Sequence, residues 1–261
     1  MENKIPIRFF IITFLWTWAF WLPWIFVGHG HATMSLGAFG PVIGVLISLR
    51  TLNGKGSIKN FFKSFISLKF GLKVWLTIFI VLVLSIIIGY IIPKLYGKNE
   101  TPPYLPSIYL FPLFLLQMIL LGGGQEEIGW RGYILPYLEK KYGLNIGSLI
   151  LGVIWAVWHL PLWFIPGTSQ QAYMNFFAFS FSCIGLSYIF SWIIAVSCNR
   201  LLSGVIIHGS VNVLLPSYAV LIMTINAEQI RLWFWMYCVL IFIVGIIMMI
   251  IRINKARKIN T

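Results

Sequence analysis

Long apolar runs, separated by short polar and basic segments, dominate the hydrophobic pattern of this chain. A run of ~20 apolar residues can cross a bilayer as a helix, so the pattern predicts about eight membrane spans. The expected spans are residues 7–28, 34–50, 74–92, 108–135, 144–165, 172–196, 202–223 and 232–251. The predicted fold class is all-α, a polytopic membrane helical bundle.

A shorter amphipathic segment lies between the second and third expected spans. Ile58, Phe61 and Phe65 recur at helical spacing, whereas Lys59 and Lys63 fall on other faces. This pattern is typical of a helix that lies in the membrane interface and contacts anionic lipid through its basic residues. A solvated basic loop is the alternative interpretation.

Composition places the chain outside the range of soluble proteins. Hydrophobic residues make up 59% of the sequence and charged residues 10%, with a mean hydropathy of +0.90. The sequence shows no internal repeat and no linker that would separate two folded units. Residues 1–261 are therefore expected to form one integral-membrane domain.

The basic residues predict how the chain is oriented. A formal net charge of +13 in a soluble protein would suggest nucleic acid, but here the charge must be read segment by segment. Of the 19 Lys and Arg residues, all except Lys94, Lys98 and Arg231 lie on one side if the chain crosses the membrane at the expected spans. The positive-inside rule then places both termini of a multi-pass protein in the cytoplasm. Membrane lipid is an expected partner, and nucleic acid is not.

The three cysteines give no sign of disulfide or metal chemistry. Cys183, Cys198 and Cys238 lie within or at the edge of apolar spans and show no C-x-x-C spacing. All three are expected to be buried apolar thiols.

Two carboxylates and a guanidinium interrupt the fourth expected span. Glu126, Glu127 and Arg131 lie deep in an apolar run, where charge is costly and function is the default hypothesis. On a helix Glu127 and Arg131 share a face, whereas Glu126 is rotated by roughly 100°. We expect Glu127 and Arg131 to form a structural ion pair and Glu126 to be the carboxylate available as a general base.

Polar side chains also occur in two later spans. His159 is surrounded by aromatic residues and precedes Pro161; taken alone, it is best explained as a packing residue. His208 and Asn212 are four residues apart and share one helical face, which should point into the bundle. Together with the glutamates these groups predict chemistry, because a carboxylate can deprotonate water while imidazole and amide groups bind that water or stabilise an oxyanion. The combination predicts hydrolysis of an amide.

Glycines accompany these polar residues. Gly122, Gly123 and Gly124 precede the glutamates, and Gly204 and Gly209 flank His208. Small residues let membrane helices approach closely, which by itself is ordinary packing. The three consecutive glycines could also loosen the helix and admit a substrate strand.

The order of these motifs resembles a known family. Glu126-Glu127-x-x-x-Arg131, an aromatic-x-x-x-His ending at His159, and His208-x-x-x-Asn212 follow one another on separate spans. This arrangement resembles the CPBP family, also called the ABI or CAAX-protease-like family of intramembrane proteases, which includes the Rce1-type prenyl-protein endopeptidases. The resemblance covers roughly residues 108–220, the expected catalytic half. Trp155 stands where the family usually has Phe.

The resemblance implies an eight-helix bundle with a cavity that opens toward the cytoplasm and in which Glu126 activates water. It further implies that His159 and His208 position water or stabilise the tetrahedral intermediate, with Asn212 as an oxyanion partner. The expected catalytic residues are Glu126, Glu127, Arg131, His159, His208 and Asn212.

Metal dependence is left open at this point. A His2Glu set made of Glu126, His159 and His208 would resemble known catalytic zinc ligation. However, the helical H-E-x-x-H motif is absent, and the family has also been described as using a metal-independent glutamate mechanism. Zinc is therefore a possible cofactor, and none is firmly implied.

The expected function is an intramembrane endopeptidase that cuts a membrane-associated or lipidated peptide. One alternative is a non-catalytic peptide-binding membrane protein of the bacteriocin-immunity type. Another is a proton-coupled transporter, since buried Glu and His residues also move protons. No pair of broken helices in matching halves of the sequence supports a transporter. The sequence predicts no oligomeric state.

Overall fold

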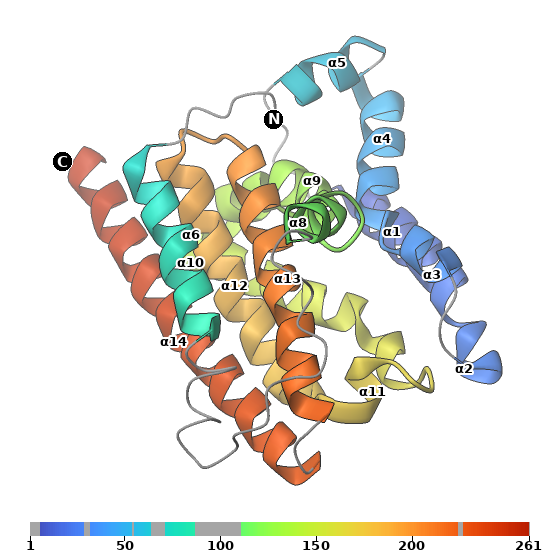
Figure 1. Cartoon of the computed structure of the whole chain (residues 1–261). Helices are drawn as coiled ribbons and strands as arrows, with labels where there is room; N and C mark the ends of the chain where they lie inside the picture. The colour runs from blue at the N-terminus through green and yellow to red at the C-terminus, as the bar shows by residue number, and fades with distance from the viewer. Residues whose placement is uncertain are drawn as a thin grey trace.

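Helices make up all the regular structure that the computed structural model describes, which covers residues 6–28, 32–53, 55–63, 71–86, 111–223 and 227–260. The long helices lie side by side (Figure 1). Their apolar side chains are either buried between the helices or exposed on the outside of the bundle. The prediction of an all-α, polytopic membrane bundle is confirmed.

The amino-terminal part of the bundle is a hairpin of interrupted helices. The first helix ends at Trp21, and a second, short helix begins at Trp24, directly after Pro23. The elements are α1 (Ile7–Trp21), α2 (Trp24–Val27), α3 (Ala32–Gly37), α4 (Gly40–Asn53) and α5 (Lys55–Lys63). Helix α1 packs along α4, where Gly40 and Gly44 allow the backbones to approach closely.

The remaining elements include a broken stretch in the middle of the chain. They are α6 (Leu72–Ile86), α8 (Phe111–Leu120), a 3-10 turn (Gly124–Glu126), α9 (Glu127–Gly129), a π-helical turn (Trp130–Ile134), α10 (Leu135–Trp158), a second 3-10 turn (Leu160–Trp163), α11 (Ser169–Tyr173), α12 (Phe176–Val196), α13 (Leu202–Met223) and α14 (Ala227–Asn260).

Five helical stretches within the described residues are long and apolar enough to cross a membrane, so the predicted number of about eight spans is not confirmed. These stretches are Ile7–Val27, Thr33–Arg50, Pro112–Trp158, Phe176–Val196 and Phe234–Lys258. The carboxyl-terminal part of the expected span 74–92 lies outside the described residues, as does the connection at 93–107.

One expected span is interrupted in the structure, and another ends earlier than expected. The span expected at 108–135 is not one helix, because the chain leaves the helix after Leu120. The start of the span expected at 144–165 agrees with the structure, because α10 is interrupted at Gly143 and its second part begins at Leu144; the expected end was wrong, since that part ends at Trp158. Gly143 has a φ of +82°, a conformation that glycine adopts without strain. The apolar run from Phe111 to Leu121 gave no sign in its hydropathy that the helix would end at Leu120.

Helix α12 is the centre of the bundle and packs against both α10 and α14. Gly185 of α12 faces Gly245 of α14 so closely that a Cβ on Gly245 would lie 2.7 Å from the Gly185 Cα. On the other side, a Cβ on Gly152 of α10 would lie 2.7 Å from the Ile184 Cα. Small residues at both contacts allow close packing of membrane helices, as their frequency in the sequence suggested.

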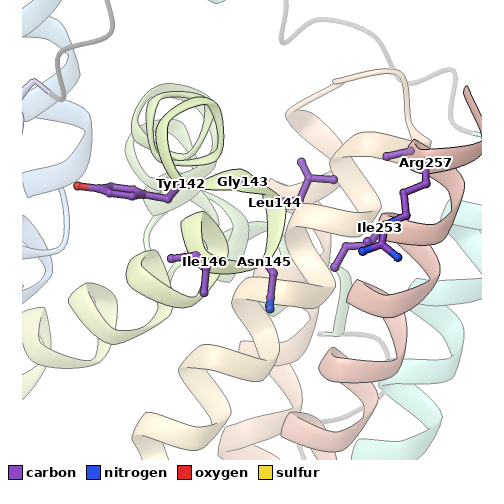
Figure 2. Close-up of a pocket in the computed structure, with 8 residues that line it drawn as sticks. Tyr142, Gly143, Leu144, Asn145, Ile146, Ile253 and Arg257 are labelled. Carbon is purple, nitrogen blue, oxygen red and sulfur yellow. The ribbon is translucent and has the colours of Figure 1, made fainter. Parts of the chain in front are cut away.

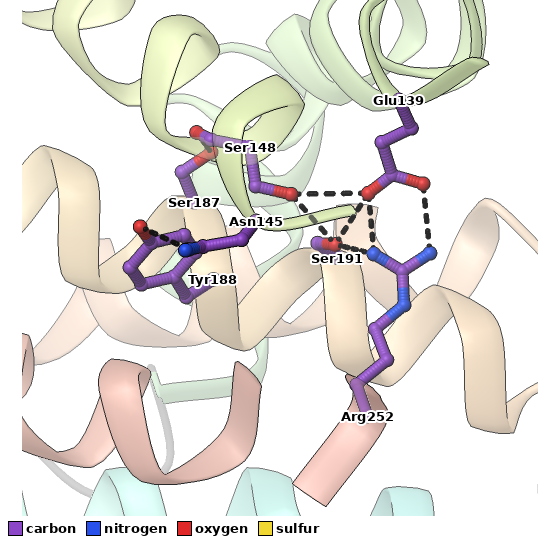
Figure 3. A network of polar contacts seen from close by, with 7 residues as sticks. All are labelled: Glu139, Asn145, Ser148, Ser187, Tyr188, Ser191 and Arg252. Carbon is purple, nitrogen blue, oxygen red and sulfur yellow. Dashed lines mark hydrogen bonds and ion pairs between the residues drawn. The ribbon is translucent and has the colours of Figure 1, made fainter. Parts of the chain in front are cut away.

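A polar network joins the three helices near one end of the bundle (Figure 3). Arg252 of α14 forms a two-pronged ion pair with Glu139 of α10, in which Nη2 donates to Oε2 over 2.8 Å and Nη1 contacts Oε1. The hydroxyls of Ser148 and Ser191 each donate to Glu139 Oε1 over 3.0 Å. Paired groups of this kind are the form in which a largely buried charge is tolerated.

The first turn of α1 and the last turns of α14 lie toward the same end of the bundle. Phe9 packs against Tyr133, with ring centroids 5.4 Å apart, while Arg252 bonds Glu139 six residues further along the chain. The side of the membrane that this end faces remains a prediction from the basic residues.

The structure corrects one expectation about the cysteines and partly tests the amphipathic segment. Cys183 and Cys238 are buried, but Cys198 is exposed, because it lies in the turn between α12 and α13 with a φ of +56°. Helix α5 confirms helical structure at 55–63, and Phe61 packs on Tyr133; residues 64–66 lie outside the described part.

We predict that Arg252→Gln lowers the apparent melting temperature of the detergent-solubilised protein. The change removes both charged donors from Glu139, and a hydrogen bond to a charged group contributes about 1.5–3 kcal/mol. Thermal unfolding followed by tryptophan fluorescence measures the loss. The control is Arg8→Gln, since Arg8 is exposed on α1.

A double-mutant cycle makes this test specific. Combining Glu139→Gln with Arg252→Gln should destabilise the protein by less than the sum of the single changes, because the two groups interact directly. Additive losses would show that the two side chains contribute independently and that the ion pair does not hold α10 to α14.

Candidate functional site

The break between α8 and α9 shapes the site. Gly123 has a φ of +125°, which side chains other than glycine rarely adopt. A Cβ at Gly123 would also lie 2.6 Å from His208 Nε2 and closer still to Asn212 Nδ2. The glycine therefore lets the broken segment approach α13, and the two carboxylates that follow enter the bundle from a tight turn.

Side chains satisfy the backbone groups that the break removes from helical hydrogen bonding. Asn212 Nδ2 donates to the Gly122 carbonyl over 2.5 Å, and the Gly123 N–H donates to Gln125 Oε1 over 2.9 Å. Inside a membrane an unpaired backbone group costs several kcal/mol, so irregular backbone needs such partners. The expectation that the three glycines loosen the helix is confirmed.

Glu127 is the paired carboxylate. Arg131 Nη1 donates to Glu127 Oε1 over 2.7 Å, with both side chains 0% exposed, so the predicted ion pair is present. His208 Nδ1 lies 2.8 Å from the same oxygen. This third partner was not predicted, because it joins residues 81 positions apart.

Glu126 has a different environment from Glu127, as expected for adjacent residues that point to different sides of a helical turn. Its Oε2 accepts a hydrogen bond from the Trp155 indole over 2.9 Å, and it forms no ion pair with any residue that the structure describes. The side chain is buried at the end of the 3-10 turn. Glu127 is thus paired with charged or ionisable groups through Oε1, whereas Glu126 is held by a single neutral donor.

Trp155 is the residue that sequence reasoning missed. Besides bonding Glu126, its ring packs edge-on against His159 and His208, at centroid distances of 5.7 and 5.2 Å. The Arg131 guanidinium lies over the same ring at 4.4 Å. Four predicted site residues from three parts of the chain therefore surround one indole.

The sequence did contain a signal for this role. Tryptophan carries an N–H donor that phenylalanine lacks, so Trp155 was more than a bulky replacement. It also lies one helical turn before His159, on the same face of α10.

Both histidines have a defined hydrogen on Nδ1. His159 Nδ1 lies 2.8 Å from the Trp155 carbonyl, which can only accept, so this nitrogen carries the proton. His208 Nδ1 faces the Glu127 carboxylate in the same way. In the neutral form each ring then presents an Nε2 lone pair, which can accept a hydrogen bond from water. His159 lies directly after α10, against Phe179.

His208 and Asn212 share one face of α13, as predicted. Their Nε2 and Nδ2 atoms both point at Gly123. Asn212 uses one amide N–H on the Gly122 carbonyl, and the second remains as a donor. All six predicted site residues are therefore gathered around Trp155 and the broken segment.

The positions of the side chains test the zinc hypothesis. Within the described parts of the chain, no three His, Cys, Asp or Glu side chains come together in a way that could hold a metal ion. Glu126 Oε2 is occupied by the Trp155 indole instead. As placed in the structure, Glu126, His159 and His208 do not form such a group, and the use of zinc stays an open prediction.

Several buried polar atoms at the site have no hydrogen-bond partner among the described residues. They are Gln125 Nε2, Glu127 Oε2, and Nε and Nη2 of Arg131. Buried polar groups without a protein partner are normally satisfied by ordered water or a ligand. The site is thus suited to hold water or a polar group of a substrate.

Comparison with known proteins agrees with this geometry. Residues 108–214 match a family model described as type II CAAX prenyl endopeptidase Rce1-like. The chain is similar to this family over that segment, which is less than half of its length. The predicted resemblance is confirmed, and the Rce1-like segment contains all six predicted site residues.

A curated relative matches in part. CAAX prenyl protease 2 of Methanococcus maripaludis is 29% identical to this chain over 103 residues. The match covers 38% of this chain and 38% of the relative, so the chain corresponds to little more than a third of the relative's length.

We predict that Glu127→Gln destabilises the protein far more than Glu126→Gln. Loss of the Glu127 charge leaves Arg131 buried without its counter-ion, and removing one partner of a buried pair costs about 3–5 kcal/mol. Gln at position 126 can still accept from Trp155. The yield of monodisperse protein and its apparent melting temperature measure both effects. Equal losses for the two variants would contradict the assignment of Glu127 as the structural carboxylate.

Proposed function

We propose that this protein is an intramembrane endopeptidase that hydrolyses a peptide bond of a membrane-associated or lipidated peptide. The observation that carries the proposal is the division of labour between two adjacent buried carboxylates. Glu127 is held by Arg131 and His208, whereas Glu126 is held by the neutral Trp155 indole. The name of the relative, CAAX prenyl protease 2, supports a lipidated substrate.

The proposed reaction uses Glu126 as a proton shuttle. With Oε2 bonded to Trp155, Oε1 is the oxygen that takes a proton from water as the water oxygen attacks the peptide carbonyl carbon. The attack gives a tetrahedral intermediate with an oxyanion. When the intermediate collapses, the C–N bond breaks and Glu126 returns the proton to the departing amine. Collapse gives a carboxylic acid and a new amino terminus, and the acid proton then passes to the amine to give a carboxylate and an ammonium group, so atoms and charge balance.

The other side chains orient the reactants in this proposal. His159 accepts a hydrogen bond from the attacking water through Nε2, because its Nδ1 proton is committed to the Trp155 carbonyl. The free N–H of Asn212 donates to the oxyanion. His208 is fixed by Glu127 and, in the neutral form, also offers a lone pair to water. Glu127 and Arg131 keep these groups in place.

The decisive experiment removes only the proton-accepting ability of residue 126. We expect Glu126→Gln to lower cleavage by about 10²–10⁴-fold, the usual contribution of general acid–base catalysis, with an unchanged melting temperature. The assay uses purified protein, a farnesylated CAAX peptide, and mass spectrometry of the products. Other substrates can be found by mass spectrometry of the peptide ends of the membrane proteome, compared between the wild type and the Glu126→Gln variant.

Two controls sharpen this test. Glu228→Gln removes a carboxylate outside the Rce1-like segment and should leave cleavage unchanged. Adding a chelator should have no effect if Glu126 acts without a metal. Full cleavage by Glu126→Gln protein would overturn the proposal; loss of cleavage with chelator alone would overturn its metal-independent form.

Trp155→Phe tests the positioning of Glu126. The variant keeps an aromatic ring but loses the N–H that fixes Oε2, so we expect kcat to fall about tenfold, as for the loss of about 1.4 kcal/mol, while KM stays near wild type. Steady-state cleavage kinetics separate the two constants. The matched control is Trp16→Phe, whose indole donates to the Leu36 carbonyl away from the site. A rise in KM with unchanged kcat would argue against a positioning role.

A further inference from the structure

A second polar feature, separate from the candidate active site, lies where α10 bends against the end of α14 (Figure 2). It is a pocket of about 280 Å³. Its lining residues are Tyr142, Gly143, Leu144, Asn145, Ile146, Ile253, Ala256 and Arg257. None of them belongs to the six predicted catalytic residues, and nothing in the proposed reaction uses them.

The pocket is amphipathic. Leu144, Ile146 and Ile253 form an aliphatic wall, and Ile146 is 45% exposed. Arg257 is exposed at the rim, on the side of α14 that faces the bend (Figure 2). A ligand that fills this pocket would therefore combine an anionic group with apolar chains.

The charge around the pocket is strongly positive. Lys141, Lys255 and Arg257 are exposed, and Lys141 Nζ lies 5.1 Å from the Tyr142 ring centroid. Glu139 is the nearby carboxylate on α10, and Arg252 neutralises it through both of its oxygens (Figure 3). The exposed cations are thus left to attract an anion from outside the protein.

The interruption of α10 at Gly143 contributes further positive charge at the pocket. The second helical part of α10 starts after Gly143, so its amino-terminal end, with a partial positive charge, borders the pocket. A Cβ at Gly143 would meet nothing within 4 Å, so the backbone here is open to a ligand.

The pocket's position relative to the apolar spans identifies the kind of ligand. The apolar stretch Phe234–Lys258 of α14 ends at the pocket. At 1.5 Å per residue its 25 residues extend about 37 Å, longer than the ~30 Å hydrocarbon core, which places its last turns among lipid headgroups. Tyr142 at the rim is a residue type enriched in this zone.

We propose that this pocket binds an anionic phospholipid. Arg257, with Lys141 and Lys255 nearby, holds the headgroup phosphate, while the acyl chains run along Ile146 and Ile253. Free phosphate could use the same cations but would leave the aliphatic wall uncovered, so the amphipathic lining favours the lipid. A zwitterionic lipid would gain little from the excess positive charge.

Native mass spectrometry of the full-length protein in detergent tests this proposal, with phosphatidylglycerol and phosphatidylcholine added as probes. The wild type should retain phosphatidylglycerol several-fold better. Arg257→Gln should weaken that binding about fivefold, since a basic residue near an anionic lipid contributes about 1 kcal/mol. The matched control, Arg8→Gln, removes an exposed arginine that does not line the pocket and should bind like wild type.

A second variant keeps the test decisive if Arg257→Gln has little effect. Ala256→Glu places a negative charge in the lining and should abolish the preference for phosphatidylglycerol, with an unchanged melting temperature.

Equal retention of both lipids by wild type, or equal losses for Arg8→Gln and Arg257→Gln, would overturn the proposal. Competition by inorganic phosphate at the same concentration as the lipid would show an anion site rather than a lipid site. None of these variants touches Glu126, so peptide cleavage is read independently.

Discussion

Charge pairing at Glu127 is the constraint on which the rest of the structure depends. One carboxylate oxygen accepts from both Arg131 and His208, and all three side chains are buried. Removing such charges from water costs several kcal/mol per ion, so each must be held by the others. The cluster thereby fixes the π-helical turn and α13 against the short helix that carries Glu127, and it sets the position of every neighbouring group.

The helix break makes this cluster possible. On a continuous helix, Glu126 and Glu127 would leave the axis roughly 100° apart but from the same turn. After Gly123 the chain instead re-enters the bundle as a 3-10 turn, and the two carboxylates reach different helices. Glu127 meets His208 of α13, whereas Glu126 meets Trp155 of α10. The break is stable in a membrane because Asn212 and Gln125 satisfy its free backbone groups.

Local spacing predicted the contacts that lie within one or two helical turns. The Glu127–Arg131 pair and the shared face of His208 and Asn212 follow from 3.6-residue periodicity, and both were found. The His208–Glu127 contact could not be predicted in this way, since it depends on how α13 packs against the broken segment. Spacing predicted that the polar side chains would lie together inside the bundle, but it did not predict which hydrogen bonds would form between different helices.

The same limit explains the errors in the predicted spans. Apolar runs reveal how much chain is suited to lipid, but a single glycine can end a helix without changing hydropathy. Gly123 and Gly143 each interrupt a helix here, with φ angles of +125° and +82°. The triple glycine suggested the first interruption, and the polar segment before Gly143 had already separated the expected spans 108–135 and 144–165 at the second.

Burial within the bundle decides how each charge is paired. The side chains of Glu127 and Arg131 are 0% exposed and form an ion pair with each other, whereas those of Glu139 and Arg252 are 13–14% exposed and add serine hydroxyls to their ion pair. At the end of α14, exposed cations such as Arg257 need no protein partner. Glu126 is the exception, because it is buried like Glu127 yet has only the neutral donor of Trp155. A carboxylate that is buried without a paired counter-ion is costly to maintain, and its proposed use as a proton acceptor gives a physical reason for its presence.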